Sequence, residues 1–156
     1  MHGSAEDLPG RVDRVDAAVM TANVAQVFLT DEAWLGTLRA LHAVLVPSGH
    51  LVFETRVPER RAWERWAQQG PSTFHVEGLG EVRDSFELES VEEPCITFRS
   101  DRTLPDGTVV PSRSTLIFRS MPELERTLAE AGFTIREVRD APDRPGMEWV
   151  VVAQRS

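Results

Sequence analysis

Two short apolar runs separated by an amphipathic stretch dominate the first third of the chain. Residues 16–21 are mostly apolar and show no polar alternation, which is typical of a strand covered on both faces. Within residues 31–45, apolar side chains recur every three or four positions, as in a helix with one buried face. Residues 50–55 form the second apolar run. The order strand, helix, strand predicts a βαβ unit with parallel strands and a right-handed crossover.

Local signals mark both ends of the predicted helix. Thr30 is a suitable N-cap, because its hydroxyl can accept a hydrogen bond from a free amide of the first turn. Asp31 and Glu32 then place negative charge at the positive end of the helix. The segment 47–49, Pro-Ser-Gly, is expected to stop it, since proline cannot continue a helix.

The hydrophobic period changes to two between residues 70 and 120. Alternation over 81–91, 95–100 and 114–119 predicts three antiparallel strands, and Asp106-Gly107 is a strong hairpin signal. The charged face of this insertion has two possible roles, facing a ligand or lying in solvent. Its members are Arg83, Glu87, Glu89, Arg99 and Arg113.

The C-terminal third predicts a helix followed by a strand pair. Residues 120–123, Ser-Met-Pro-Glu, form a capping box with proline in the first turn, and Gly132 ends the helix. Two closing strands follow, over 133–138 and 147–153. We therefore predict an α/β fold, with two parallel strands extended by an antiparallel pair and a small antiparallel insertion. Residues 1–156 are expected to form one domain, in which 1–15 are irregular and 70–120 are the insertion.

Composition narrows the classes of partner and site. The net charge of −8 disfavours binding to a nucleic-acid backbone. No run approaches the length of a membrane-spanning helix and the first residues do not resemble a signal peptide, so we expect a cytoplasmic protein without a membrane partner. The single cysteine, Cys95, excludes an intrachain disulfide and a cysteine-rich zinc site. The four histidines are isolated from one another, so no metal site is predicted; they are His2, His42, His50 and His75.

Three stretches of sequence carry a resemblance to a known family. They read VDRVDAAVMTANVAQVF, LHAVLVPSGHLVFETRVP and, near the end, FRSMPELERTLAEAGFTIREV with EWVVVAQR. They resemble the fourth and fifth strands, the closing helix and the final hairpin of class I S-adenosylmethionine-dependent methyltransferases. Ser48 stands where that family usually has glycine. The resemblance implies an incomplete Rossmann-like sheet, because the family's glycine-rich turn and the acidic residue ending its second strand have no counterpart here.

The resemblance also suggests where S-adenosylmethionine could be held. Ser4, Ala5 and Glu6 lie in a segment similar to the family's adenine-binding loop, with Ser4 in place of its aspartate. A frayed N-terminal tail is the alternative interpretation. Thr21 and Asn23 follow the first strand, where open α/β sheets bind ligands, and complete the predicted cofactor contacts.

Four further residues are candidates for binding a substrate. Glu54 and Arg56 lie at the end of the second strand, so we expect them to face the same crevice at the strand ends as Thr21 and Asn23. A buried Glu54–Arg56 network that holds the strand end is the alternative. Trp63 and Trp66 share one face of a helix expected after Pro58. They could form an aromatic wall for the substrate, although packing in the core is the favoured interpretation.

Two functions are compatible with these features. The first is methyl transfer to a small molecule, with the cofactor site completed by another chain or by upstream sequence. The cofactor supplies the reactivity and the protein mainly positions the reactants, so no catalytic residue is predicted. The second is a non-catalytic remnant that acts as an interaction or scaffold module. In either case the strand 16–21 would have a bare apolar edge, so we expect a homodimer through Asp16–Phe28.

Overall fold

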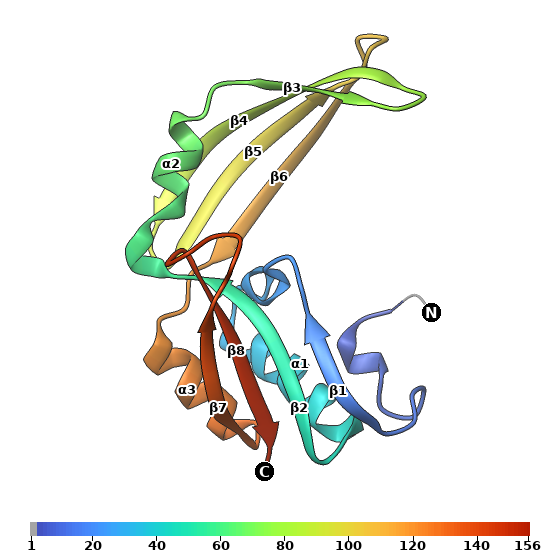
Figure 1. Cartoon of the computed structure of the whole chain (residues 1–156), viewed down its shortest axis with the longest axis vertical. Helices are drawn as coiled ribbons and strands as arrows, with labels where there is room; N and C mark the ends of the chain where they lie inside the picture. The colour runs from blue at the N-terminus through green and yellow to red at the C-terminus, as the bar shows by residue number, and fades with distance from the viewer. Residues whose placement is uncertain (1–2) are drawn as a thin grey trace.

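The structure, a computed structural model, describes residues 3–156 and contains two four-stranded sheets (Figure 1). His2 lies outside the described residues. The first sheet has the strand order β1-β2-β8-β7. Strands β1 and β2 are parallel, whereas β8 is antiparallel to both of its neighbours. The predicted α/β fold is therefore confirmed. The strands are β1 (Val15–Met20), β2 (Leu45–Arg56), β7 (Phe133–Asp140) and β8 (Glu148–Arg155).

Two helices cover only one face of this sheet. They are α1 (Asp31–Val44) and α3 (Met121–Glu130), which pack against each other and enclose the main core with the sheet. Along β2 the residues Leu51, Phe53 and Thr55 are buried, while those between them are only half-buried. On β1, Val19 is 62% exposed. The expectation that residues 16–21 are covered on both faces is wrong, because both helices lie on the same side.

The helix ends and the following bulge are set by local geometry. The Thr30 hydroxyl accepts a hydrogen bond from the Ala33 amide at 3.2 Å, as predicted for the N-cap. The helix ends at Val44, and β2 begins at once. Segment 47–49 lies in a bulge inside β2, where the pairing with β1 shifts register and Ser48 has a φ of 63°. The segment therefore interrupts a strand rather than terminating the helix.

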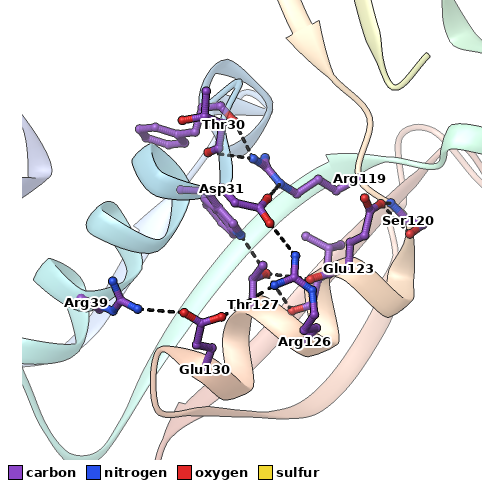
Figure 2. A network of polar contacts seen from close by, with 12 residues as sticks. Thr30, Asp31, Arg39, Arg119, Ser120, Glu123, Arg126, Thr127 and Glu130 are labelled. Atoms are coloured by element: carbon purple, nitrogen blue, oxygen red, sulfur yellow. Dashed lines mark hydrogen bonds and ion pairs between the residues drawn. The ribbon is translucent and has the colours of Figure 1, made fainter.

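Polar contacts tie α3 and the segment before it to the start of α1 (Figure 2). Buried Arg119 donates to the carbonyl oxygen of Phe28 at 2.6 Å and to that of Thr30 at 3.3 Å. On the surface, Arg126 pairs with Asp31 at 2.5 Å. The predicted capping box is present at the start of α3, where the Ser120 amide donates to the Glu123 carboxylate at 2.7 Å.

The second sheet is the predicted insertion with one additional strand. The strands are β3 (Ser72–Val76), β4 (Gly80–Glu92), β5 (Cys95–Thr103) and β6 (Val109–Ile117), antiparallel in this order. The β5–β6 turn contains Asp106-Gly107, with Gly107 at a φ of 85°. Strand β3 was not predicted, because its short sequence forms an exposed edge and offers little apolar alternation.

Three members of the charged face of the insertion, Glu89, Arg99 and Arg113, form ion pairs. Arg113 bonds to Glu89 at 2.6 Å, and Arg99 bonds to Asp101 through two nitrogens at 2.9 and 2.8 Å. The arginine of each pair is exposed and its carboxylate partner is partly exposed, which favours the interpretation of a solvated surface.

A short helix connects the two sheets. Residues Pro58–Arg60 form a 3-10 turn, and α2 (Ala62–Gln68) then packs against the insertion. A second core forms there around Ala62, Trp63, Ile96 and Phe118. Within residues 3–156, no helix is long and apolar enough to cross a membrane.

Candidate functional site

Three strand ends meet at one edge of the first sheet. Strands β1 and β2 both finish there, and β8 begins there because it runs antiparallel, so that Arg56 is opposite Glu148. This is the edge at which open α/β sheets bind ligands. The insertion joins the first sheet beside it (Figure 1).

A strained turn follows β1 at this edge. Ala22 and Asn23 have φ values of 56° and 57°, a left-handed conformation that non-glycine residues rarely adopt. The Asn23 amide donates to Glu54 Oε1 at 3.2 Å, and its side-chain Nδ2 donates to Glu148 Oε1 at 3.1 Å. The short 3-10 helix η2 (Val24–Val27) comes next. These two bonds hold the turn against β2 and β8.

Glu148 is the centre of a buried polar network. Its side chain is only 2% exposed, and Oε1 accepts from Arg144 Nη1 at 2.7 Å and lies 3.6 Å from Arg56 Nε. Within the described part of the chain, Glu148 Oε2 and Asn23 Oδ1 have no hydrogen-bond partner although both atoms are buried. Since unpaired buried oxygens cost free energy, this network is a specialised feature rather than ordinary packing.

Arg56 connects this network to the insertion. Its Nη1 donates to Gln26 Oε1 at 2.8 Å, and the buried Gln26 donates in turn to the carbonyl oxygen of Ile117 at the end of β6. The Arg56 guanidinium carbon lies 4.7 Å from the centre of the Trp66 ring, within the range of a cation–π interaction. Burial lowers the pKa of Arg56, and the carboxylates of Glu148 and Glu54 offset only part of this effect.

Arg56 and Trp66 line a cavity of about 330 Å³ between α2 and the insertion sheet. One wall is aromatic, because Trp66 packs edge-on against Phe86 and Phe98 at centroid distances of 6.1 and 5.8 Å. The remaining lining is mostly polar. The lining residues are Arg56, Trp66, Gln69, Gly70, Ser72, Asp84, Ser85, Phe86, Phe98, Ser100 and Leu116.

The residues predicted to bind a substrate take different positions. Arg56 and Trp66 reach the cavity, as described above. Trp63 does not line it: the side chain is 2% exposed and packs edge-on against Phe118 at 4.7 Å. Trp63 therefore packs in the core, which is the interpretation that the sequence favoured for this pair, whereas Trp66 lies on the wall of the cavity. Glu54 and Arg56 do belong to a common network, but Asn23 and Glu148 mediate it rather than a direct bond between them.

The residues predicted to bind the cofactor form two separate groups. Ser4 precedes the 3-10 helix η1 (Ala5–Asp7), and its amide donates to Asp7 Oδ2 at 2.9 Å. Glu6 lies against Gly36 of α1, where an added Cβ would meet its carboxylate at 2.7 Å. At the end of β1, Thr21 is exposed, whereas the Asn23 side chain is engaged internally.

The fit of these five residues to S-adenosylmethionine is therefore partial. None of them lines the cavity, and the Asn23 side chain is already hydrogen-bonded to Glu148. They do not form a common cavity that could enclose a cofactor. In residues 3–156, no group of three His, Cys, Asp or Glu side chains is arranged to hold a metal ion.

Sequence reasoning missed Gln26, Arg144 and Glu148. Gln26 lies in a segment that reads as an ordinary polar turn, and Arg144 lies in a loop. Glu148 had a weak signal, because it is a charged residue at the start of an otherwise apolar strand. Its partners lie up to 125 residues away, so sequence spacing could not identify them.

Comparisons with known proteins identify the fold. No protein-family model and no curated protein sequence matches the chain. Among solved structures, an S-adenosylmethionine-dependent methyltransferase from Clostridium acetobutylicum is similar with a TM-score of 0.73 and 10% identity, covering 92% of this chain and 59% of its own. CalS10, an amino pentose methyltransferase from Micromonospora echinaspora determined with bound S-adenosylmethionine, has a TM-score of 0.68 and 19% identity, with coverage of 92% and 59%.

A third similar structure is the sugar N-methyltransferase KedS8 from Streptoalloteichus, with a TM-score of 0.67, 14% identity, and coverage of 92% of this chain and 57% of its own. The chain thus spans less than two thirds of the length of these enzymes. Identities this low establish the fold alone. This chain has the fold of part of a class I S-adenosylmethionine-dependent methyltransferase.

Proposed function

We propose that this chain forms the acceptor-binding part of an S-adenosylmethionine-dependent methyltransferase, acting on a small molecule. The cofactor site is completed by another chain or by sequence upstream of these residues. The observation that carries the proposal is the cavity between α2 and the insertion sheet, which Arg56 reaches from the carboxyl end of β2. Ligands bind at this edge in open α/β sheets.

The side chains of the cavity are suited to position an acceptor. S-adenosylmethionine, when bound, supplies the methyl group on a sulfonium sulfur, and this chain contributes binding and orientation. Phe86 and Phe98 present apolar surface, while Ser72 and Ser100 present hydroxyl groups. Such a mixture fits a ring that has one apolar face and several polar substituents.

The class of acceptor follows from this lining and from the similar structures. CalS10 is described as an amino pentose methyltransferase and KedS8 as a sugar N-methyltransferase. We extend this chemistry to the present chain and propose a hydroxylated or amino-substituted ring as the acceptor.

Calorimetric titration with S-adenosylmethionine tests the proposal. It is performed on the chain alone and on the chain produced together with the polypeptide encoded immediately upstream of it. We expect binding in the combined sample and weak or no binding to the chain alone, because the five predicted cofactor residues do not form a common cavity. Absence of binding in both samples would contradict the proposal.

A non-catalytic interaction or scaffold module is the second candidate function. It is favoured by the free edge of β1 and by the uncovered face of the first sheet, where Val19 is 62% exposed and the neighbouring Val27 is 50% exposed. Exposed apolar surface of this kind is typical of an interface. A stable complex formed through this surface without cofactor binding would support this alternative.

A further inference from the structure

The cavity is lined by two charged side chains of opposite sign, Asp84 and Arg56. Asp84 carries the negative charge: its Oδ2 accepts from Arg102 Nη2 at 3.3 Å on the neighbouring strand, while its Oδ1 is buried and has no hydrogen-bond partner among residues 3–156. Arg56 carries the positive charge. Its carboxylate partner Glu148 is 3.6 Å from Nε, and the same carboxylate oxygen also accepts from Arg144 and Asn23. Each of the two side chains therefore keeps a polar atom without a partner, and Arg56 is the one that can donate to an oxygen atom of a ligand.

The guanidinium of Arg56 is fixed on two of its three nitrogens. Nη1 is held by Gln26, and Nε faces Glu148. Nη2 makes no hydrogen bond within residues 3–156, and the side chain retains 21% exposure at the cavity. Contact with the Trp66 ring also restricts the plane of the group. A guanidinium held in this way is organised in advance to donate to an oxygen in the cavity.

Because the Arg56 guanidinium is largely buried, an anionic hydrogen-bond acceptor stabilises it more than a neutral one does. Desolvation is the largest influence on Arg56 and lowers its pKa, so its cationic form would gain from an additional anion. A hydrogen bond between a guanidinium and a carboxylate is stronger than one to a neutral hydroxyl.

We propose that the cavity binds a small ligand bearing a carboxylate, which accepts from Arg56 Nη2 while the apolar part of the ligand contacts Phe86 and Phe98. Gln26 is a positioning residue for Arg56. This inference rests on the proposed function only in identifying the ligand as the acceptor, since the binding itself requires no cofactor.

Titration of the full chain with sodium benzoate and benzyl alcohol, followed by nuclear magnetic resonance, tests the inference. Both probes contain the same ring, and only benzoate carries a carboxylate. We expect benzoate to shift the Trp66 indole and Ser100 amide signals and to bind at least about tenfold more tightly than benzyl alcohol. Equal affinities, or benzoate shifts confined to other parts of the surface, would overturn the inference.

Three variants test whether Arg56 causes the tighter binding of benzoate than of benzyl alcohol. Arg56→Gln should abolish this preference for benzoate. Arg65→Gln should retain it, because Arg65 is exposed on α2 and does not line the cavity. Arg56→Lys keeps a positive charge and should retain a reduced preference, which decides the question if Arg56→Gln fails to fold. A full preference in folded Arg56→Gln, or none in folded Arg56→Lys, would contradict the assignment. The cofactor titration is a separate measurement, so either proposal can fail without the other.

Discussion

The indole nitrogen of Trp34 donates a hydrogen bond to Thr127 Oγ1 at 3.0 Å, and this contact joins α1 to α3 inside the main core. Both side chains are fully buried. The Thr127 hydroxyl accepts this hydrogen bond and also donates one to the carbonyl oxygen of Glu123 at 2.8 Å. The two helices are therefore linked by a polar contact that water cannot replace.

Replacement of Thr127 should test this link. Thr127→Val keeps the shape but leaves the indole N–H buried without an acceptor, so we expect a loss of about 1–3 kcal/mol in the free energy of unfolding. Thr127→Ser retains the hydroxyl and should lose less. Urea denaturation measures both. A Thr127→Val variant as stable as the original chain would show that the contact contributes little.

The bulge in β2 should respond in opposite directions to two neighbouring substitutions. Ser48 has a φ of 63°, so Ser48→Gly should raise the free energy of unfolding by about 0.5–1 kcal/mol by relieving a left-handed residue. At Gly49 an added Cβ would approach the carbonyl oxygens of Val46 and Asp16 at 2.9 and 3.1 Å, so Gly49→Ala should be destabilising. Thermal unfolding compares them, and a stabilising Gly49→Ala would contradict the geometry.

Asn23 should contribute to stability as well as to the site. Its side chain is buried and donates to Glu148, so Asn23→Ala should lower the free energy of unfolding by about 1–3 kcal/mol. A residue that only contacts a ligand at the end of a strand would instead have almost no effect on the free energy of unfolding when it is replaced. Thr21→Ala serves as the control, because Thr21 is exposed on the same turn. Equal stability of both variants would favour a pure ligand-binding role for Asn23.

His42 should make stability dependent on pH. Burial and, to a smaller extent, the positive charge of Arg155 lower the pKa of His42 from its ordinary value of 6.5. The unfolded chain therefore binds a proton at His42 more tightly than the folded chain does. The stability that depends on neutral His42 is present above pH 6.5 and is lost as the pH falls through the lower pKa of the folded state.

The free energy of unfolding can be measured between about pH 7.5 and 5.5, one pH unit on either side of the ordinary histidine pKa. Over this range we expect it to depend less on pH in His42→Gln than in the original chain. His75→Gln is a suitable control, since His75 is exposed on β3. An unchanged pH dependence in His42→Gln would refute the assignment.

Homodimerisation through Asp16–Phe28 remains a prediction with a specific surface. Val19 and Val27 are both at least half exposed, whereas Phe28 is partly sheltered by Trp34 at a ring distance of 5.8 Å. We expect a dimer at tens of micromolar, and Val19→Glu should dissociate it or cause aggregation. Val138→Glu, on the opposite edge strand β7, should leave it intact. Sedimentation that finds a monomer of the original chain would exclude this interface.

Local signals in the sequence determined most of the secondary structure. The N-cap at Thr30, the capping box of Ser120 and Glu123, and the Asp106-Gly107 turn each depend on residues within a few positions of one another. Such contacts form in the same way whatever surrounds them, so pattern and propensity suffice to place them. The parallel pair and the antiparallel hairpin followed from the order of these elements together with the family resemblance.

Only the tertiary structure decided which side chains form the site. Trp63 and Trp66 lie on the same short helix, yet one is in the core and the other lines the cavity, because the insertion sheet covers them unequally. Asn23 and Glu148 are 125 residues apart, and their contact exists only because β8 returns antiparallel beside β2. The uncovered sheet face likewise depends on where α1 and α3 pack. Long-range pairing sets these features, and the local sequence carries almost no signal for it.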